Sequence, residues 1–147
     1  MNSFVQFLGK ERLMKTLLSI KPNFVAEIVN GKKQFEFRKT LYKRRDLKTI
    51  VVYSSSPVCR LVGEIEVEDI LYENPDKLWK LTKSAAGITK ECFQNYFAGK
   101  HYAYAIKIKA FHPYEKPLVL DEKYPGVTPP QSFCYVESEL QPILKYV

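Results

Sequence analysis

The sequence predicts an α+β fold, in which a small β-barrel or a strongly curved mixed sheet is covered at one end by helices. Several short segments, far apart in the chain, alternate between apolar and polar residues or run as buried-type apolar stretches. A few segments between them repeat apolar residues at helical spacing. With 147 residues, of which 46% are hydrophobic, the chain is long enough for one domain with one core.

The first elements are predicted from the spacing of apolar residues and from residues that end a helix or a strand. Residues 16–20 are typical of a strand, and Lys21-Pro22 ends it because proline suits the first position of a helix. Apolar residues then recur at helical spacing from Phe24 to Val29. Gly31 can close this helix in the left-handed conformation.

The later elements follow from alternation, caps and proline. Alternation from Gly63 predicts a half-exposed strand over 61–71, and Thr89 is a good cap for a helix that Gly99 closes. The same signals predict, in chain order, a strand at 33–39, a basic loop at 41–48, a strand at 50–53, a helix at 75–84, a strand at 102–111 and a short final strand at 132–136.

The segment at 30–39 carries the strongest functional signal. If residues 33–38 are extended, alternate side chains point to opposite faces. Phe35 and Phe37 then face a core, and the opposite face presents Gln34, Glu36 and Arg38. A carboxylate beside a guanidinium suits a polar, partly anionic ligand such as a nucleotide. The alternative is a cross-strand ion pair on a solvated face of the sheet.

The positive charge is concentrated in one part of the chain. Residues 10–48 hold twelve Lys or Arg and four acidic residues, which accounts for the whole net charge of +7. This segment predicts either a surface that faces a polyanion or a solvated basic face without a partner. The lysines and arginines expected to contact phosphate are Lys32, Lys43, Arg44 and Arg45.

Several classes of protein are disfavoured by the composition. No run approaches the roughly 18 apolar residues that cross a bilayer, and the first residues make a poor signal peptide, so we expect a cytoplasmic protein with no membrane contact. The three cysteines, Cys59, Cys92 and Cys134, are widely spaced, and His101 and His112 have no ligand partner at metal spacing. We therefore expect no metal and no cofactor.

Five motifs follow one another along the chain. They are Leu17-Leu18-Ser19-Ile20-Lys21-Pro22, Gly31-Lys32-Lys33-x-x-Glu36-x-Arg38, Val52-Tyr53-Ser54-Ser55-Ser56-Pro57, Val62-Gly63-Glu64 and Pro129-Pro130-Gln131-Ser132-Phe133. This order resembles the ASCH domain, a family of the PUA-like superfamily. The resemblance implies a β-barrel core with helices over one end and a cleft near Gly31–Lys33 that binds RNA or a nucleotide. Because similar domains begin near a Met-Lys pair like Met14-Lys15, residues 14–147 are expected to form one domain and residues 1–13 an N-terminal extension.

The resemblance also raises an enzymatic alternative. Some small bacterial members hydrolyse acetylcytidine with a lysine after the glycine, a threonine three residues later and a glutamate before the later helix. By position, Lys33 takes the place of the lysine, Glu36 stands where the threonine should be, and Ala85-Ala86 lies near the place of the glutamate. Glu91 comes several residues too late. Lys33 is therefore the catalytic candidate if the chain is a hydrolase of a modified nucleoside or of RNA.

Three functions are consistent with these residues. The first is a domain that binds RNA or a nucleotide and reads one base, the second is the hydrolase, and the third is a regulatory domain that docks an acidic protein partner. The candidate ligand residues are Lys21, Lys33, Glu36, Arg38, Ser54, Ser55, Gln131 and Ser132. The serines and Gln131 also fit plain turns. Tyr102, Tyr104, Tyr135 and Trp79 could stack on bases but also fit a core.

Overall fold

The computed structural model describes residues 5–146, without the side chains of residues 10–11, 139–143 and 146. Within this range one sheet holds six strands in the order β2-β5-β4-β3-β1-β6. The elements, in chain order, are β1 (Val5–Ile20), α1 (Pro22–Val29), β2 (Phe35–Arg38), β3 (Thr49–Ser54), β4 (Arg60–Glu73), α2 (Pro75–Thr82), η1 (Lys83–Ala85), α3 (Lys90–Tyr96), β5 (Ala103–Leu118), α4 (Leu120–Lys123) and β6 (Phe133–Tyr146).

The α+β class predicted from the sequence is confirmed, but the sheet is not a closed barrel. β1 and β3 are parallel, and the other neighbouring strands are antiparallel. β2 and β6 are the two edge strands and are not paired with each other in the described sheet. Register shifts in β4 and β5 mark irregular pairing, which bends strands. The sheet therefore curves and leaves a seam open beside β2.

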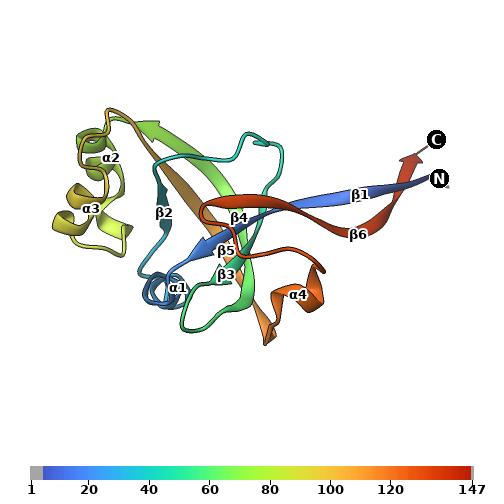
Figure 1. The fold of residues 1–147 in the computed structure, drawn as a ribbon. Coiled ribbons are helices and arrows are strands. Elements are labelled where there is room, and N and C mark those ends of the chain that lie inside the picture. The colour runs from blue at the N-terminus through green and yellow to red at the C-terminus, as the bar shows by residue number, and fades with distance from the viewer. Residues whose placement is uncertain (1–4, 147) are drawn as a thin grey trace.

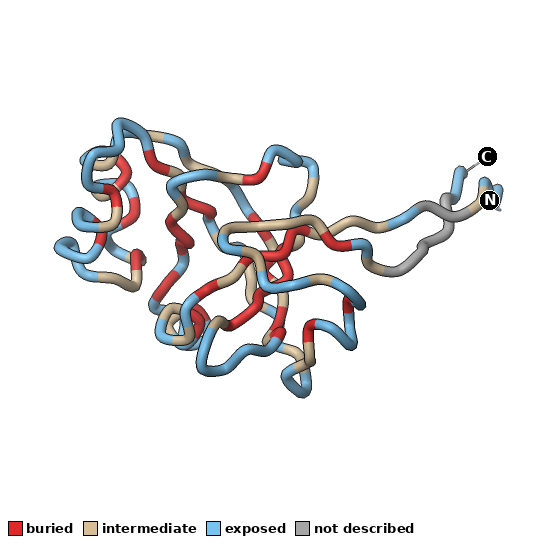
Figure 2. Tube along the Cα trace, in the orientation of Figure 1, coloured by how far each residue is buried: buried red, intermediate tan, exposed pale blue. Residues whose placement is uncertain are grey.

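Buried residues follow the strands of the sheet (Figure 2), and hydrophobic residues pack in clusters on both of its faces. One cluster joins alternate residues of the central strands to Val25 and Ile28 of α1. On the other side, α2, η1 and α3 cover β2 and the start of β5 (Figure 1). Phe35 and Phe37 belong to this second cluster, and the Phe37 ring meets the Phe93 ring edge-on with 5.1 Å between centroids. The expected core orientation of Phe35 and Phe37 is confirmed.

Most predicted elements are present, with different ends. The helix expected at 75–84 is α2 followed by the short η1, and the strand expected at 102–111 continues through two prolines to Leu118. The last strand starts close to its expected position but runs to Tyr146. It pairs with β1, whose first residues were not predicted as a strand. The two strands form a ribbon that projects from the body in Figure 1.

The projecting ribbon explains why residues 5–13 showed no period. Val5, Phe7 and Leu8 are exposed, with 47%, 60% and 50% of their surface open to solvent. Without a buried face, a strand gains nothing from alternating apolar and polar residues. Among the described residues, no helix is long and apolar enough to cross a membrane.

Candidate functional site

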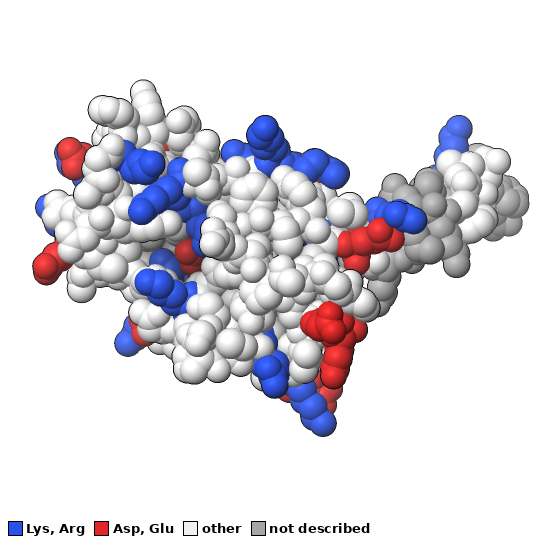
Figure 3. Space-filling view, in the orientation of Figure 1, with Lys and Arg blue, Asp and Glu red and all other residues white. Residues whose placement is uncertain are grey.

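A cavity of about 750 Å³ opens at the seam beside β2. Its walls come from β2, the end of β1, the start of α1, the turn after β3, α3 and the segment 129–132. In Figure 3 a hollow lies between the part of the molecule that carries α2 and α3 and the body of the sheet, and Lys and Arg side chains border it. Ligand pockets of about 300–1,000 Å³ are typical for small molecules, so a nucleotide fits by size.

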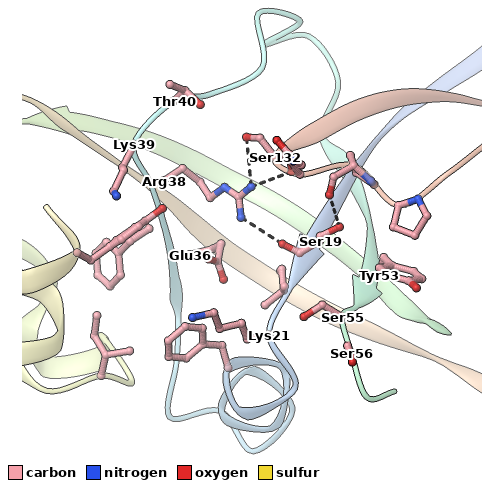
Figure 4. Close-up of a pocket in the computed structure, with 18 of the residues that line it drawn as sticks. Ser19, Lys21, Glu36, Arg38, Lys39, Thr40, Tyr53, Ser55, Ser56 and Ser132 are labelled. Atoms are coloured by element: carbon pink, nitrogen blue, oxygen red, sulfur yellow. Dashed lines mark hydrogen bonds between the residues drawn. The ribbon is translucent and has the colours of Figure 1, made fainter. Parts of the chain in front are cut away.

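Glu36 lies in the wall of this cavity, in the middle of β2 (Figure 4). Its side chain is only 5% exposed, and Oε2 has no hydrogen-bond partner among the described residues. Burial raises the pKa of the Glu36 carboxyl, and the positive charges of Lys33 and Arg38 offset part of that rise. A buried carboxyl oxygen without a donor is uncommon, and it is a suitable acceptor for a ligand that brings N–H or O–H groups.

Lys33 supplies a fixed positive charge next to Glu36. Its Nζ donates a hydrogen bond to the carbonyl of Ala86 at 3.2 Å and lies 4.7 Å from the centroid of the Phe37 ring. The residue is only 3% exposed, and burial lowers the pKa of the amine, although the charge of Glu36 works against this. The backbone of Gly87 passes so close that an added Cβ would lie 2.3 Å from Cβ of Lys33. The lysine is therefore held in place by the Ala86 carbonyl at its amine and by the Gly87 backbone against its Cβ.

Arg38 joins the two sides of the seam (Figure 4). Its guanidinium donates to the carbonyl oxygen of Ser19 at 3.3 Å, to the carbonyl of Ser132 at 2.8 Å and to Oγ of Ser132 at 3.4 Å. The hydroxyl of Ser19 in turn donates to the carbonyl of Pro130 at 2.7 Å. Side-chain hydrogen bonds thus hold β2, the end of β1 and the segment 129–132 together where no strand ladder forms. Arg38 positions the cavity walls.

The rim of the cavity is polar and basic. Lys21 at the start of α1 and Lys39 at the end of β2 are exposed and line the cavity. The Lys39 amine lies 4.7 Å from the centroid of the Tyr96 ring. Ser55, Ser56 and Gln131 complete the polar side of the rim. These groups give an anionic ligand both charge and hydrogen-bond donors at the mouth of the cavity.

The structure brings together seven of the eight candidate ligand residues predicted from the sequence. The residues that line the cavity are Lys21, Lys33, Glu36, Arg38, Ser55, Gln131 and Ser132. Ser54 does not line it, because it lies within β3 and is only 2% exposed. Gln34 precedes β2, is exposed and does not join Glu36 and Arg38 in the cavity wall.

The four lysines and arginines predicted to contact phosphate lie outside the cavity. Lys32 is exposed after α1, and the other three lie on the loop between β2 and β3, where Figure 3 shows a group of basic side chains. Arg44 forms an ion pair with Asp46 at 2.7 Å, whereas the Arg45 guanidinium lies 5.6 Å from the rings of Tyr42 and Tyr104. These four residues could therefore contact phosphate only on the outer surface of the protein, outside the cavity.

Sequence reasoning did not find several lining residues. They are Ser19, Ile20, Phe24, Phe37, Lys39, Thr40, Tyr53, Cys59, Ile88, Cys92, Tyr96, Pro129 and Pro130. Ser19, Ile20, Tyr53, Pro129 and Pro130 lie inside the quoted motifs, so the motifs themselves could have indicated them. The residues of α3 reach the cavity only because that helix packs beside β2, and no local pattern reports this packing.

The positions that correspond to the acetylcytidine hydrolases do not supply their acid. Ala86, near the expected glutamate, contacts Lys33 through its backbone carbonyl. Glu91 is exposed on α3 and does not line the cavity. Among the lining residues that the structure describes, Glu36 is the carboxylate. No group of three or more His, Cys, Asp or Glu in residues 5–146 is arranged to hold a metal ion.

A family model and a known relative name the same family. A family model described as the ASCH domain matches residues 18–112. An ASCH domain-containing ribonuclease of Zymomonas mobilis is 28% identical over 128 residues, which cover 85% of this chain and 86% of that protein. The large ribosomal subunit protein uL22 of Ureaplasma parvum is 28% identical over 88 residues, which cover 60% of this chain but only 28% of that protein.

Solved structures show the same relationship. The crystal structure of ASCH from Zymomonas mobilis superimposes with a TM-score of 0.76 at 28% identity and covers 83% of this chain and 87% of that chain. A tyrosine-to-phenylalanine mutant of that protein also has a TM-score of 0.76, at 27% identity, and covers 83% and 89% of the two chains. The similarity therefore extends over most of the chain.

Proposed function

The chain belongs to the ASCH domain family, and from this premise we propose that it binds single-stranded RNA and holds one nucleotide in the cavity beside β2. The observation that carries the proposal is the buried Glu36 carboxyl, whose Oε2 has no partner among the described residues and which lies in a cavity of nucleotide size. The relative named as a ribonuclease supports RNA as the ligand.

The chemistry of a nucleotide matches the distribution of charge. A carboxylate can accept hydrogen bonds from the amino and imino groups on the edge of a base. Lys21 and Lys39, exposed at the rim, suit the phosphates on either side. The base then lies inward against Glu36, and the backbone stays at the solvent. Because phosphate contacts dominate affinity, binding is expected to weaken steeply as salt increases.

Fluorescence anisotropy with labelled oligoribonucleotides tests the proposal. Glu36→Gln keeps the size of the side chain but turns one acceptor into a donor, so it should lower affinity at least tenfold and change the preference among the four bases. Lys80→Gln on α2 is the matched control, because Lys80 is exposed and does not line the cavity. Equal affinities of the wild type, Glu36→Gln and a Lys21→Ala/Lys39→Ala double variant at low salt would contradict the proposal.

Cleavage of the bound RNA is the second candidate function, favoured by the ribonuclease of Zymomonas mobilis. In this reaction the 2′-oxygen attacks the adjacent phosphorus, the O2′–P bond forms and the P–O5′ bond breaks. The products are a 2′,3′-cyclic phosphate and a free 5′-hydroxyl. One group must take the proton of the 2′-hydroxyl, and another must give a proton to the departing O5′.

The pKa shifts of Glu36 and Lys33 run in the direction that favours such a reaction. A raised pKa makes the Glu36 carboxylate a stronger base, and a lowered pKa makes the Lys33 ammonium a stronger acid. In this function Glu36 meets the ribose hydroxyl instead of the base edge. Arg38 holds the walls and adds positive charge near the phosphate.

Product analysis separates binding from cleavage. Cleavage should give cyclic phosphate ends and should stop when a single 2′-deoxynucleotide replaces the nucleotide at the cut site. Lys33→Met should remove cleavage but leave measurable binding. If the wild type binds RNA but leaves it intact, the binding function stands and ribonuclease activity is excluded. Complexes that survive nuclease treatment in a pull-down would instead indicate the acidic protein partner.

A further inference from the structure

Three tyrosines stack in a row on the β4–β5 pair, outside the cavity. The rings of Tyr72 and Tyr104 have centroids 4.5 Å apart with an angle of 22° between planes. The rings of Tyr72 and Tyr102 have centroids 5.0 Å apart with an angle of 29°. Tyr72 is 52% exposed and Tyr102 is 56% exposed. Large aromatic side chains this exposed do not serve the core. Because Tyr104 and Tyr102 both stack on Tyr72, the faces of the Tyr72 ring are covered, and Tyr102 is the exposed ring at the end of the row.

The row begins next to the cavity wall. Arg38 of β2 is paired with Tyr104 of β5, and Tyr104 is paired with Tyr72 of β4. Directly paired residues place their side chains on the same face of a sheet, so these three side chains cross one face in sequence. With about 4.8 Å between neighbouring strands, the Tyr72 backbone lies roughly 10 Å from that of Arg38. An RNA strand that leaves the cavity past Arg38 therefore comes directly to the tyrosines.

Basic side chains lie at both ends of the row. The Arg45 guanidinium lies 5.6 Å from the centroid of the Tyr104 ring, at one end. At the other end, the exposed Lys100 lies two residues before Tyr102. Glu73, which follows Tyr72 along β4, is neutralised by an ion pair with a lysine of α2 at 3.2 Å. Exposed aromatic rings between basic side chains match single-stranded nucleic acid, in which flat bases alternate with phosphates.

We propose that Tyr102, backed by Tyr72, forms a stacking platform for a base that flanks the nucleotide in the cavity. The inference rests on the proposed RNA function and extends it: the protein engages a short single-stranded segment, not an isolated nucleotide. The platform supplies affinity without reading sequence, because every base has a face that can stack. In this proposal the cavity distinguishes between bases, and the tyrosines on the sheet favour ligands longer than one nucleotide.

Binding of short and long ligands tests the platform. We would titrate the full chain with uridine monophosphate and with a hexauridylate whose 2′-oxygens are methylated, so that attack by the 2′-oxygen is blocked. Tyr72→Ala/Tyr102→Ala should weaken hexamer binding about tenfold or more, since stacking contributes about 1–3 kcal/mol per base and 1.4 kcal/mol corresponds to a factor of ten. Its affinity for the monophosphate should equal that of the wild type.

Two further variants exclude simpler explanations. Tyr72→Phe/Tyr102→Phe keeps the rings and should bind the hexamer within about twofold of the wild type. Leu81→Ala removes an equally exposed apolar side chain from α2 and should have no effect. Urea unfolding of each variant shows whether the fold is intact.

The outcomes of the proposed function and of the platform are distinguishable. If the wild type binds the hexamer and the alanine variant binds it equally well, the platform is wrong and the RNA function stands. If the alanine variant loses monophosphate and hexamer binding to the same extent, or if the phenylalanine variant fails like the alanine variant, stacking is also refuted. If the wild type binds neither ligand, both the RNA function and the platform are wrong.

Discussion

Replacement of Gly87 tests how the cavity wall is held. Gly87 lies in the turn between η1 and α3, with a φ of +67°. A Cβ added there would lie 2.3 Å from Cβ of Lys33 and 2.7 Å from its Cα. The Lys33 backbone cannot move away easily, because its N–H bonds the carbonyl of Glu27 at 2.9 Å. Gly87→Ala must therefore displace the turn or the lysine.

The expected loss of stability has two parts. An L-residue in the left-handed region costs about 1–2 kcal/mol, and this part applies to Gly87. Overpacking a close contact adds about 1–3 kcal/mol. Gly99 provides the matched control, because its φ is +78° and an added Cβ would meet nothing within 4 Å. Gly99→Ala should therefore show the first part alone.

Urea unfolding and thermal melts of the two variants measure the difference. Gly87→Ala should be less stable than Gly99→Ala by about 1–3 kcal/mol, which corresponds to roughly 2–12 °C in melting temperature for a domain of this size. It should also weaken RNA binding, because Lys33 lines the cavity, whereas Gly99→Ala should not. Equal stability of the two variants, or normal RNA binding by Gly87→Ala, would refute the idea that this glycine fixes Lys33.

Three other substitutions give independent checks. Burial raises the pKa of folded Glu36, so the folded residue keeps its proton at a pH at which the unfolded residue has lost it. The stability of the wild type relative to Glu36→Gln should therefore fall as pH rises through this range. A difference between the two free energies of unfolding in urea that stays constant from pH 4 to 7 would exclude this. Tyr42→Phe removes a buried hydroxyl that has no partner among the described residues, so it should leave stability unchanged or raise it. Tyr114→Phe loses a 2.8 Å hydrogen bond to a carboxylate of β4 and should cost about 1.5 kcal/mol. If urea unfolding ranks the two variants in the reverse order, the hydrogen-bond assignment is contradicted. Arg38→Lys cannot reach both sides of the seam at once and should cost about 1–3 kcal/mol. It should also speed hydrogen exchange at the amides of Gln131 and Ser132, and unchanged exchange there would show that the bridge is dispensable.

Local signals were sufficient for the elements that have a buried face. Pro22 and Gly31 mark the two ends of the first helix region, and the structure places α1 between them with Gly31 at a φ of +81°. The alternation after Gly63 predicted β4 because its Ile65 and Val67 are buried while the acidic residues between them are more exposed. The projecting part of the β1–β6 ribbon gave no such signal, because its stability comes from pairing with a distant strand and not from burial.

The candidate site divides in the same way. Alternation along β2 was enough to place Glu36 and Arg38 opposite Phe35 and Phe37. It could not show that α3 and the segment 129–132 close over them, because that depends on which strands remain unpaired. Tyr72 was missed since the recognisable alternation ended one residue earlier, and its stacking depends on β5, some thirty residues later in the chain.

The open seam connects the fold to the proposed function. If β2 continued the ladder to the next strand, backbone hydrogen bonds would fill the space that the cavity now occupies. Instead, Arg38 spans the gap with its side chain, and Glu36 points into the space left beside it. Burying an acceptor without a donor costs about 1–3 kcal/mol in proteins, and the charges of Lys33 and Arg38 reduce that cost without removing it. A ligand that donates hydrogen bonds to Glu36 recovers this energy on binding, whereas a ligand without donors leaves the carboxyl unsatisfied. The proposed recognition of a base therefore depends on the strand that does not close the sheet.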